Sequence, residues 1–182
     1  MKRIFFFLLV VCAALGVSAN SAFASSVHLK GGSNAKPSFT DNGLSLNSSG
    51  ALSGLGNGDV LITLTAKANV TSTCTNQGGN PAPGQNPAPI TVSGSEAIPA
   101  SAVKNGTVAF NVNTAAPNPI IAGAPDCANT NWTETITNLA FTSAVITVQQ
   151  PPGTTVLTVS CAFKPPTSDG SVAANTVTCT ST

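Results

Sequence analysis

The chain has 182 residues, of which 42% are hydrophobic and only 7% are charged. After position 24, five lysines stand against six carboxylates, which gives a formal charge of −1. This balance excludes nucleic-acid binding, which needs a basic stripe to neutralise phosphates. It also excludes peripheral membrane binding, which needs a basic or amphipathic face.

The N-terminus has the order of a secretory signal peptide. Lys2 and Arg3 precede an apolar run, which small residues follow up to Ala24. This order predicts a signal peptide over residues 1–24, with cleavage after Ala19 as the alternative. The apolar run is too short for a comfortable membrane span, so no membrane insertion is expected after cleavage. We therefore expect a secreted protein, either extracellular or in the cell envelope.

The most regular pattern lies in residues 59–74, "DVLITLTAKANVTSTC", where apolar or small side chains alternate with polar ones from Val60 to Cys74. Period two predicts a β-strand with one buried and one wet face. Because a strand of this length bends, we expect a bulge near residues 66–69. The same alternation predicts strands within 106–113, 155–163 and 175–181, and shorter candidates are 27–30, 44–52 and 90–94.

Residues 134–150 are also rich in β-formers, but their alternation slips near Asn138. They form either two short strands or one bulged strand. Turn signals stand at 41–43, 56–59 and 149–155, and no window shows a helical period. Short strands with turns at such intervals predict an all-β fold, an antiparallel β-sandwich of immunoglobulin-like or similar type, as a single domain over residues 25–182.

Four cysteines follow position 24: Cys74, Cys127, Cys161 and Cys179. An even number in a secreted chain predicts two disulfides. Cys161 and Cys179 fall on matching faces of a predicted hairpin, so the preferred pairing is Cys161–Cys179 with Cys74–Cys127. Two other connectivities remain open. The cysteines lack zinc-site spacing and there is one histidine, so neither a metal site nor a cofactor is predicted.

The chain offers few groups for catalysis. Three aspartates lie beside Gly or Asn in predicted turns, where capping is the simpler role: Asp41, Asp59 and Asp169. Glu96 and Glu134 remain as the pair that a two-carboxylate enzyme would use, provided that they meet in one pocket. We predict no catalytic residue and a protein that is not an enzyme.

Two features bear on ligand binding. The uncharged stretch "CTNQGGNPAPGQNPAPI" over residues 74–90 predicts a long surface loop, with a dedicated binding loop as the alternative. Trp132, the only tryptophan, is expected in the core beside a disulfide, and its alternative role is a ligand platform. In that second role its partners would be the loop amides of Gln77, Asn80, Gln85 and Asn86.

Three segments carry a resemblance: "FTDNGLSLNSSGALSGLGNGDVLITLTAKANV", "CTNQGGNPAPGQNP" and "NWTETITNLAFTSAVITV". In this order they resemble small secreted bacterial proteins, over most of residues 27–160. The resemblance implies an extracellular bacterial β-protein and no particular site.

Together these observations favour a secreted, non-catalytic structural or adhesive protein, whose partner would be a cell-surface glycan or protein. The alternatives are a glycan-binding module and a secreted inhibitor or effector that presents residues 75–89 to a protein partner.

Overall fold

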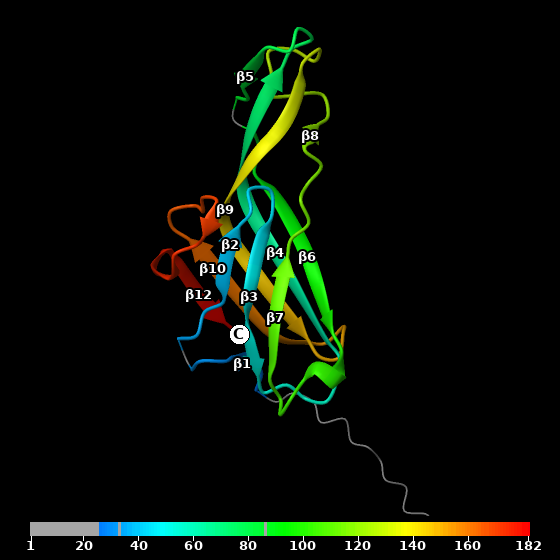
Figure 1. Ribbon diagram of the computed structural model, residues 1–182, viewed down its shortest axis with the longest axis vertical. Helices are drawn as coiled ribbons and strands as arrows, with labels where there is room; N and C mark the ends of the chain where they lie inside the picture. The colour runs from blue at the N-terminus through cyan, green and yellow to red at the C-terminus, as the bar shows by residue number, and fades with distance from the viewer. Residues whose placement is uncertain (1–25, 33, 86) are drawn as a thin grey trace, which may run out of the picture.

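The computed structural model describes residues 26–182 except 33 and 86, so the predicted signal peptide lies outside the described residues. Two antiparallel sheets pack face to face, as the sequence predicts for a β-sandwich (Figure 1). Within the described part of the chain, no helix has the length and apolar character needed to cross a membrane.

The first sheet is built around β3 (Leu46–Ser53). On one side β3 pairs with β7 (Val108–Asn113), and on the other side with β2 (Ser38–Asp41) and β1 (His28–Leu29). The short strand β11 (Gly170–Ser171) extends this sheet next to β2. Of these strands, β2 and β11 have no counterpart among the predicted elements.

The second sheet is built around two long strands, β4 (Val60–Thr75) and β9 (Thr133–Gln149), which pair over nearly their whole length. The other edge of β4 pairs first with β6 (Ile90–Ile98) and then with β5 (Pro81–Pro83). The other edge of β9 pairs with β8 (Ile120–Ile121) and β10 (Thr155–Phe163), and β12 (Val177–Ser181) follows β10. Two short 3-10 turns, η1 (Ala100–Ala102) and η2 (Ala174–Thr176), lie in the connections.

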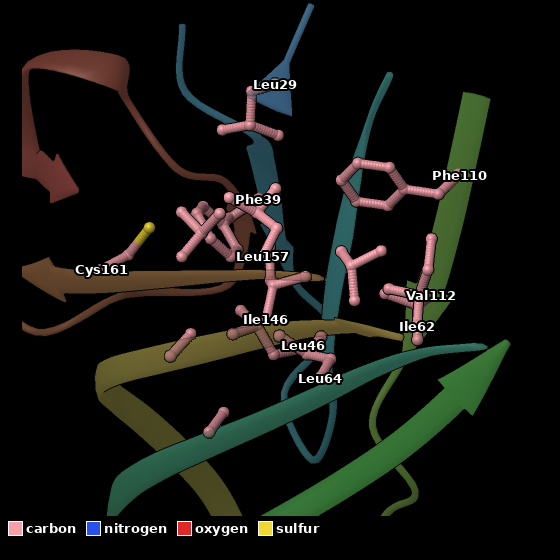
Figure 2. Close-up of a cluster of buried hydrophobic side chains, with 14 of the residues drawn as sticks. Leu29, Phe39, Leu46, Ile62, Leu64, Phe110, Val112, Ile146, Leu157 and Cys161 are labelled. Carbon is pink, nitrogen blue, oxygen red and sulfur yellow. The ribbon is translucent and has the colours of Figure 1, made fainter. Parts of the chain in front are cut away.

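The core lies between the sheets and follows the predicted alternation. On β4 the buried side chains include Ile62 and Leu64, while the alternating Thr63 and Thr65 are only partly buried. Figure 2 shows these side chains facing residues of the opposite sheet such as Leu46 and Phe110. Removal of this apolar surface from water, worth about 25 cal/mol per Å², is what holds the two sheets together.

Two β-bulges explain why the alternation slips in residues 134–150. The register between β4 and β9 shifts between Thr71 and Ser72, and again between Lys67 and Ala68. At these points Thr137 and Thr142 are the extra residues of β9, and their hydroxyls donate to the carbonyl oxygens of Thr71 and Lys67, both at 3.2 Å. The segment is therefore one bulged strand. An irregularity is present near residues 66–69 as expected, but the extra residue is Thr142 of β9 and not a residue of β4.

Both preferred disulfide pairings are confirmed. Cys161 on β10 lies directly opposite Cys179 on β12, with 4.1 Å between their Cα atoms. The connection between these strands is more than a turn, because it carries β11 across to the first sheet. Cys74 at the end of β4 is joined to Cys127, which lies in the connection between β8 and β9.

The two sheets meet closely where β6 passes the end of β7. The Ala115 N–H donates to the Ser93 carbonyl oxygen (2.9 Å). This hydrogen bond attaches the chain that follows β7, in the first sheet, to β6 in the second sheet. A Cβ on Gly94 would lie 1.9 Å from the Asn113 carbonyl oxygen. Only glycine therefore permits this contact between the sheets.

Candidate functional site

The candidate site lies at the far end of the two long strands. Residues 72–75 of β4 and 133–136 of β9 continue past the sandwich as a narrow ribbon, flanked by β5 and β8 (Figure 1). We call the end of this ribbon, together with loops 76–89 and 114–132, the tip. Asn86, one of the predicted ligand-binding residues, lies outside the described residues.

The first loop folds back on the ribbon. Its turn is closed by the Gly79 N–H, which donates to the Asn76 carbonyl oxygen (2.9 Å), and by the Asn80 N–H, which donates to Asn76 Oδ1 (2.9 Å). The next three residues form β5, where Pro81 and Pro83 are tolerated because the strand lies at an edge. The predicted surface loop thus contains a short strand that becomes one wall of the site.

Gly84 fits this wall tightly against β4. Its N–H donates to the Ser72 carbonyl oxygen (3.0 Å). A Cβ at this position would lie 1.9 Å from Ser72 Oγ, so any other residue would push the loop away from the ribbon.

The second loop is attached to the first through Asp126. The Asp126 carbonyl oxygen accepts from the Gln85 N–H (2.9 Å), and the neighbouring Cys127 forms the disulfide with Cys74. The disulfide therefore attaches the second loop to the end of β4, and the backbone hydrogen bond joins the two loops to each other.

Glu134 is the polar centre of the tip. Its side chain is 0% exposed and lies on β9 opposite Cys74. Ser72 Oγ donates to Glu134 Oε1 (2.7 Å), and the Asp126 N–H donates to Glu134 Oε2 (3.3 Å). The carboxyl group thus links the ribbon to the second loop, a structural role that sequence reasoning missed.

A cavity of about 270 Å³ opens between the two loops. Its lining combines alanine and proline residues with the two cysteines of the disulfide, a tryptophan, a glutamine and an aspartate. The lining residues are Cys74, Ala82, Pro83, Gln85, Pro125, Asp126, Cys127, Ala128 and Trp132. Hollows of about 450 Å³ and 380 Å³ lie on the sandwich, but no aromatic side chain is among the described residues that line them.

The structure brings together some of the predicted ligand-binding residues. Trp132 and Gln85 line the cavity, whereas Gln77 and Asn80 are exposed on the turn before β5, outside its lining. Trp132 is partly buried and lies apart from the core between the sheets, so its expected core position is wrong. Its expected proximity to a disulfide is confirmed, because Cys74 and Cys127 line the same cavity.

Glu96 and Glu134 do not meet. Glu96 pairs with Ile62 and Glu134 with Cys74, and these β4 residues are twelve positions apart. At about 3.3 Å per residue the two carboxylates are separated by roughly 40 Å along the sheet. Glu96 instead accepts the Asn111 N–H (2.8 Å) and ties β7 to β6. An active site built from these two glutamates is ruled out.

Two of the three aspartates hold turns or loops, as predicted. Asp41 Oδ1 accepts the Gly43 N–H (2.9 Å), and Asp59 Oδ1 accepts the Ala100 N–H (2.8 Å). Asp41 is also buried and accepts the Thr167 hydroxyl. Burial is the main cause that raises the pKa of Asp41 above its ordinary value of 3.8.

Across residues 26–182 as described, no group of three or more His, Cys, Asp or Glu side chains is arranged to hold a metal ion. No family model, no curated protein and no solved structure matches the chain. The resemblance to small secreted bacterial proteins is therefore supported only in its coarser part, an all-β chain with two disulfides.

Proposed function

We propose that this is a secreted, non-catalytic adhesive protein that uses the sandwich as a support and the tip as its contact with a cell-surface partner. One observation carries the proposal. The ribbon holds a cavity away from the sandwich, a disulfide attaches the second loop to β4, and a backbone hydrogen bond joins that loop to the first. Preorganised loops lose less conformational freedom when they bind, which favours recognition.

The outer face of the second sheet supports an extracellular role. Ser95, Thr63, Thr147 and Thr158 stand side by side across four neighbouring strands. Hydroxyl groups thus keep this face wetted with very few charges. The two disulfides are also typical of oxidising compartments.

Binding of the fluorescently labelled protein to cells and extracellular matrix of the producing organism tests this proposal. We expect the wild-type protein to bind, Trp132→Ala to lose most of the binding, and Lys67→Ala to retain it. Lys67 is the control because it is exposed on the sandwich part of β4. Equal binding by all three proteins would contradict a role for the tip. A hydrolytic activity that disappears on replacement of one polar residue would contradict the non-catalytic assignment.

A second candidate is a glycan-binding module at the same cavity. Trp132 and Gln85 favour it, because a partly exposed indole and an amide are groups that contact a sugar ring and its hydroxyls. A glycan that binds there would shift the fluorescence of the single tryptophan. A glycan array without hits, together with unchanged fluorescence, would remove this candidate.

A further inference from the structure

The tip differs from the rest of the molecule in its charge. Residues 69–90 and 114–138 contain two carboxylates, Asp126 and Glu134, and neither lysine nor arginine. Lys67 is the lysine nearest along β4, seven positions before Cys74. At about 3.3 Å per residue it lies roughly 23 Å away along the strand. The tip therefore has an uncompensated negative potential.

Asp126 brings this charge to the cavity. It lines the cavity and is only partly buried. Its backbone is fixed on both sides, because its N–H donates to Glu134 Oε2 (3.3 Å) and its carbonyl oxygen accepts from the Gln85 N–H (2.9 Å). Among the side chains that the structure describes, none forms a hydrogen bond or ion pair with its carboxylate. The backbone of Asp126 is thus fixed beside the cavity, and its carboxylate is available to a ligand.

Trp132 supplies the second element on the same wall. The face of an indole attracts cations, and this attraction grows as water is excluded. The proline and alanine residues that line the same cavity provide an apolar surface for the carbon atoms next to the charge. An inorganic cation would gain nothing from these apolar walls. An organic ammonium group would, because its carbon atoms would be buried against them.

The size of the cavity limits the ligand. A volume of about 270 Å³ lies just below the range of roughly 300–1,000 Å³ that is typical of small-molecule sites. It suits one sugar ring or one long amino-acid side chain at the end of a larger partner.

From this charge and shape we propose that the tip cavity binds an organic ammonium group, with the Asp126 carboxylate and the Trp132 indole as its two contacts. The inference rests on the proposed function of the tip and adds the chemistry of its ligand. The indole of Trp132 and the amide of Gln85 favour an amino sugar of a partly deacetylated glycan as the source of this group, and a lysine side chain of a protein is the other outcome of the test.

Two matched pairs of probes test the proposal, with the fluorescence of the single tryptophan and calorimetry as readouts. The glycan pair is the chitosan trimer and its neutral N-acetylated counterpart. The peptide pair is Nα-acetyl-lysine methylamide and the same compound with an acetylated ε-amine. We expect at least one charged member to bind about tenfold more tightly than its neutral counterpart, and the pair that shows this preference identifies the source.

Variants locate the effect. Asp126→Asn should reduce the affinity for the charged probe about tenfold and abolish the preference, and added salt should weaken wild-type binding in the same direction. Asp169→Asn removes an exposed carboxylate from the connection between β10 and β12 and should leave both unchanged. Retention of both disulfides and of the circular-dichroism spectrum shows that the variants are folded.

Equal binding of charged and neutral probes, or no binding of any probe at millimolar concentration, would overturn the ammonium site. The proposed function would still stand in either case if Trp132→Ala lost its adhesion to the bacterial surface. If that variant retained adhesion, the proposed function would fail as well.

Discussion

Replacing Cys74 and Cys127 by alanine removes the crosslink between the end of β4 and the second loop of the tip. The two cysteines are 53 residues apart in the sequence, whereas Cys161 and Cys179 are 18 apart. In the chain-entropy model, a 53-residue loop corresponds to about 4 kcal/mol and an 18-residue loop to about 3 kcal/mol at 25 °C. If the molecule unfolds in one step, loss of the tip disulfide should therefore cost more than loss of the other.

The location of the two disulfides predicts the opposite order for the sandwich. Cys161 is 3% exposed and belongs to the core cluster between the sheets, with Cys179 packed against it. Cys74 and Cys127 lie at the tip, outside that cluster. Because few core contacts are made there, the tip can open while the sandwich stays folded. We expect the tip variant to lose local stability and the Cys161→Ala, Cys179→Ala variant to lose global stability.

Urea denaturation with two probes separates these outcomes. Trp132 is the only tryptophan and lies at the tip, so its fluorescence reports local opening. Far-UV circular dichroism reports both sheets. In the tip variant the fluorescence transition should move to lower urea, while the circular-dichroism midpoint stays close to the wild-type value. In the variant without the Cys161–Cys179 disulfide, the two transitions should move to lower urea together. This shift should correspond to a loss of about 3 kcal/mol in the free energy of unfolding.

The reasoning would be refuted if the two transitions of the tip variant coincided and both gave a free energy of unfolding about 4 kcal/mol below that of the wild type. That result would mean that the ribbon and the sandwich form one cooperative unit.

Three further changes test the fold. Gly94→Ala places a Cβ 1.9 Å from the Asn113 carbonyl oxygen and should destabilise the protein by about 1–3 kcal/mol or more. Thermal denaturation measures this loss. The control is Gly58→Ala, whose Cβ would meet its nearest atom at 3.5 Å and which should destabilise the protein less. Gln150→Ala removes a buried amide that makes three hydrogen bonds of 2.7–3.0 Å to the loop between β3 and β4, and should cost about 1–3 kcal/mol in urea denaturation. Burial raises the pKa of Asp41, so the folded protein holds this proton more tightly than the unfolded chain. Stability should therefore fall as the pH rises from 3.8 through the folded pKa, and this part of the slope should be missing in Asp41→Asn. An unchanged slope in that variant would show that Asp41 does not contribute to it.

The sandwich could be predicted because its main strands carry their own signal. In β4 every second residue from Val60 to Ala68 is buried, and the alternation is visible without a partner strand. In β9 the slip of the alternation near Asn138 was visible too. A bulge, however, places two residues of one strand opposite one residue of its partner, so it cannot be recognised from one strand alone. One bulged strand could be distinguished from two short ones only when β4 was placed beside it.

The short strands and the site could not be predicted for a related reason. β5, β8 and β11 contain two or three residues each, too few to show any period. The cavity joins two loops that are about 40 positions apart, through contacts such as the Gln85 N–H with the Asp126 carbonyl oxygen. The preferred Cys74–Cys127 pairing was the one signal that brought these loops together.

The two bulges connect the fold to the proposed function. The buried positions of β4 keep one phase from Val60 to Cys74, except that Val70 is only partly buried, whereas the buried positions of β9 change phase twice. Each bulge adds local twist, which carries the ribbon away from the sandwich (Figure 1). The face of β4 that buries Leu64 between the sheets therefore buries Ser72 and Cys74 against the tip loops. Because the long strands carry the cavity away from the core between the sheets, the side chains of Asp126 and Trp132 can determine what binds there without determining whether the sandwich folds.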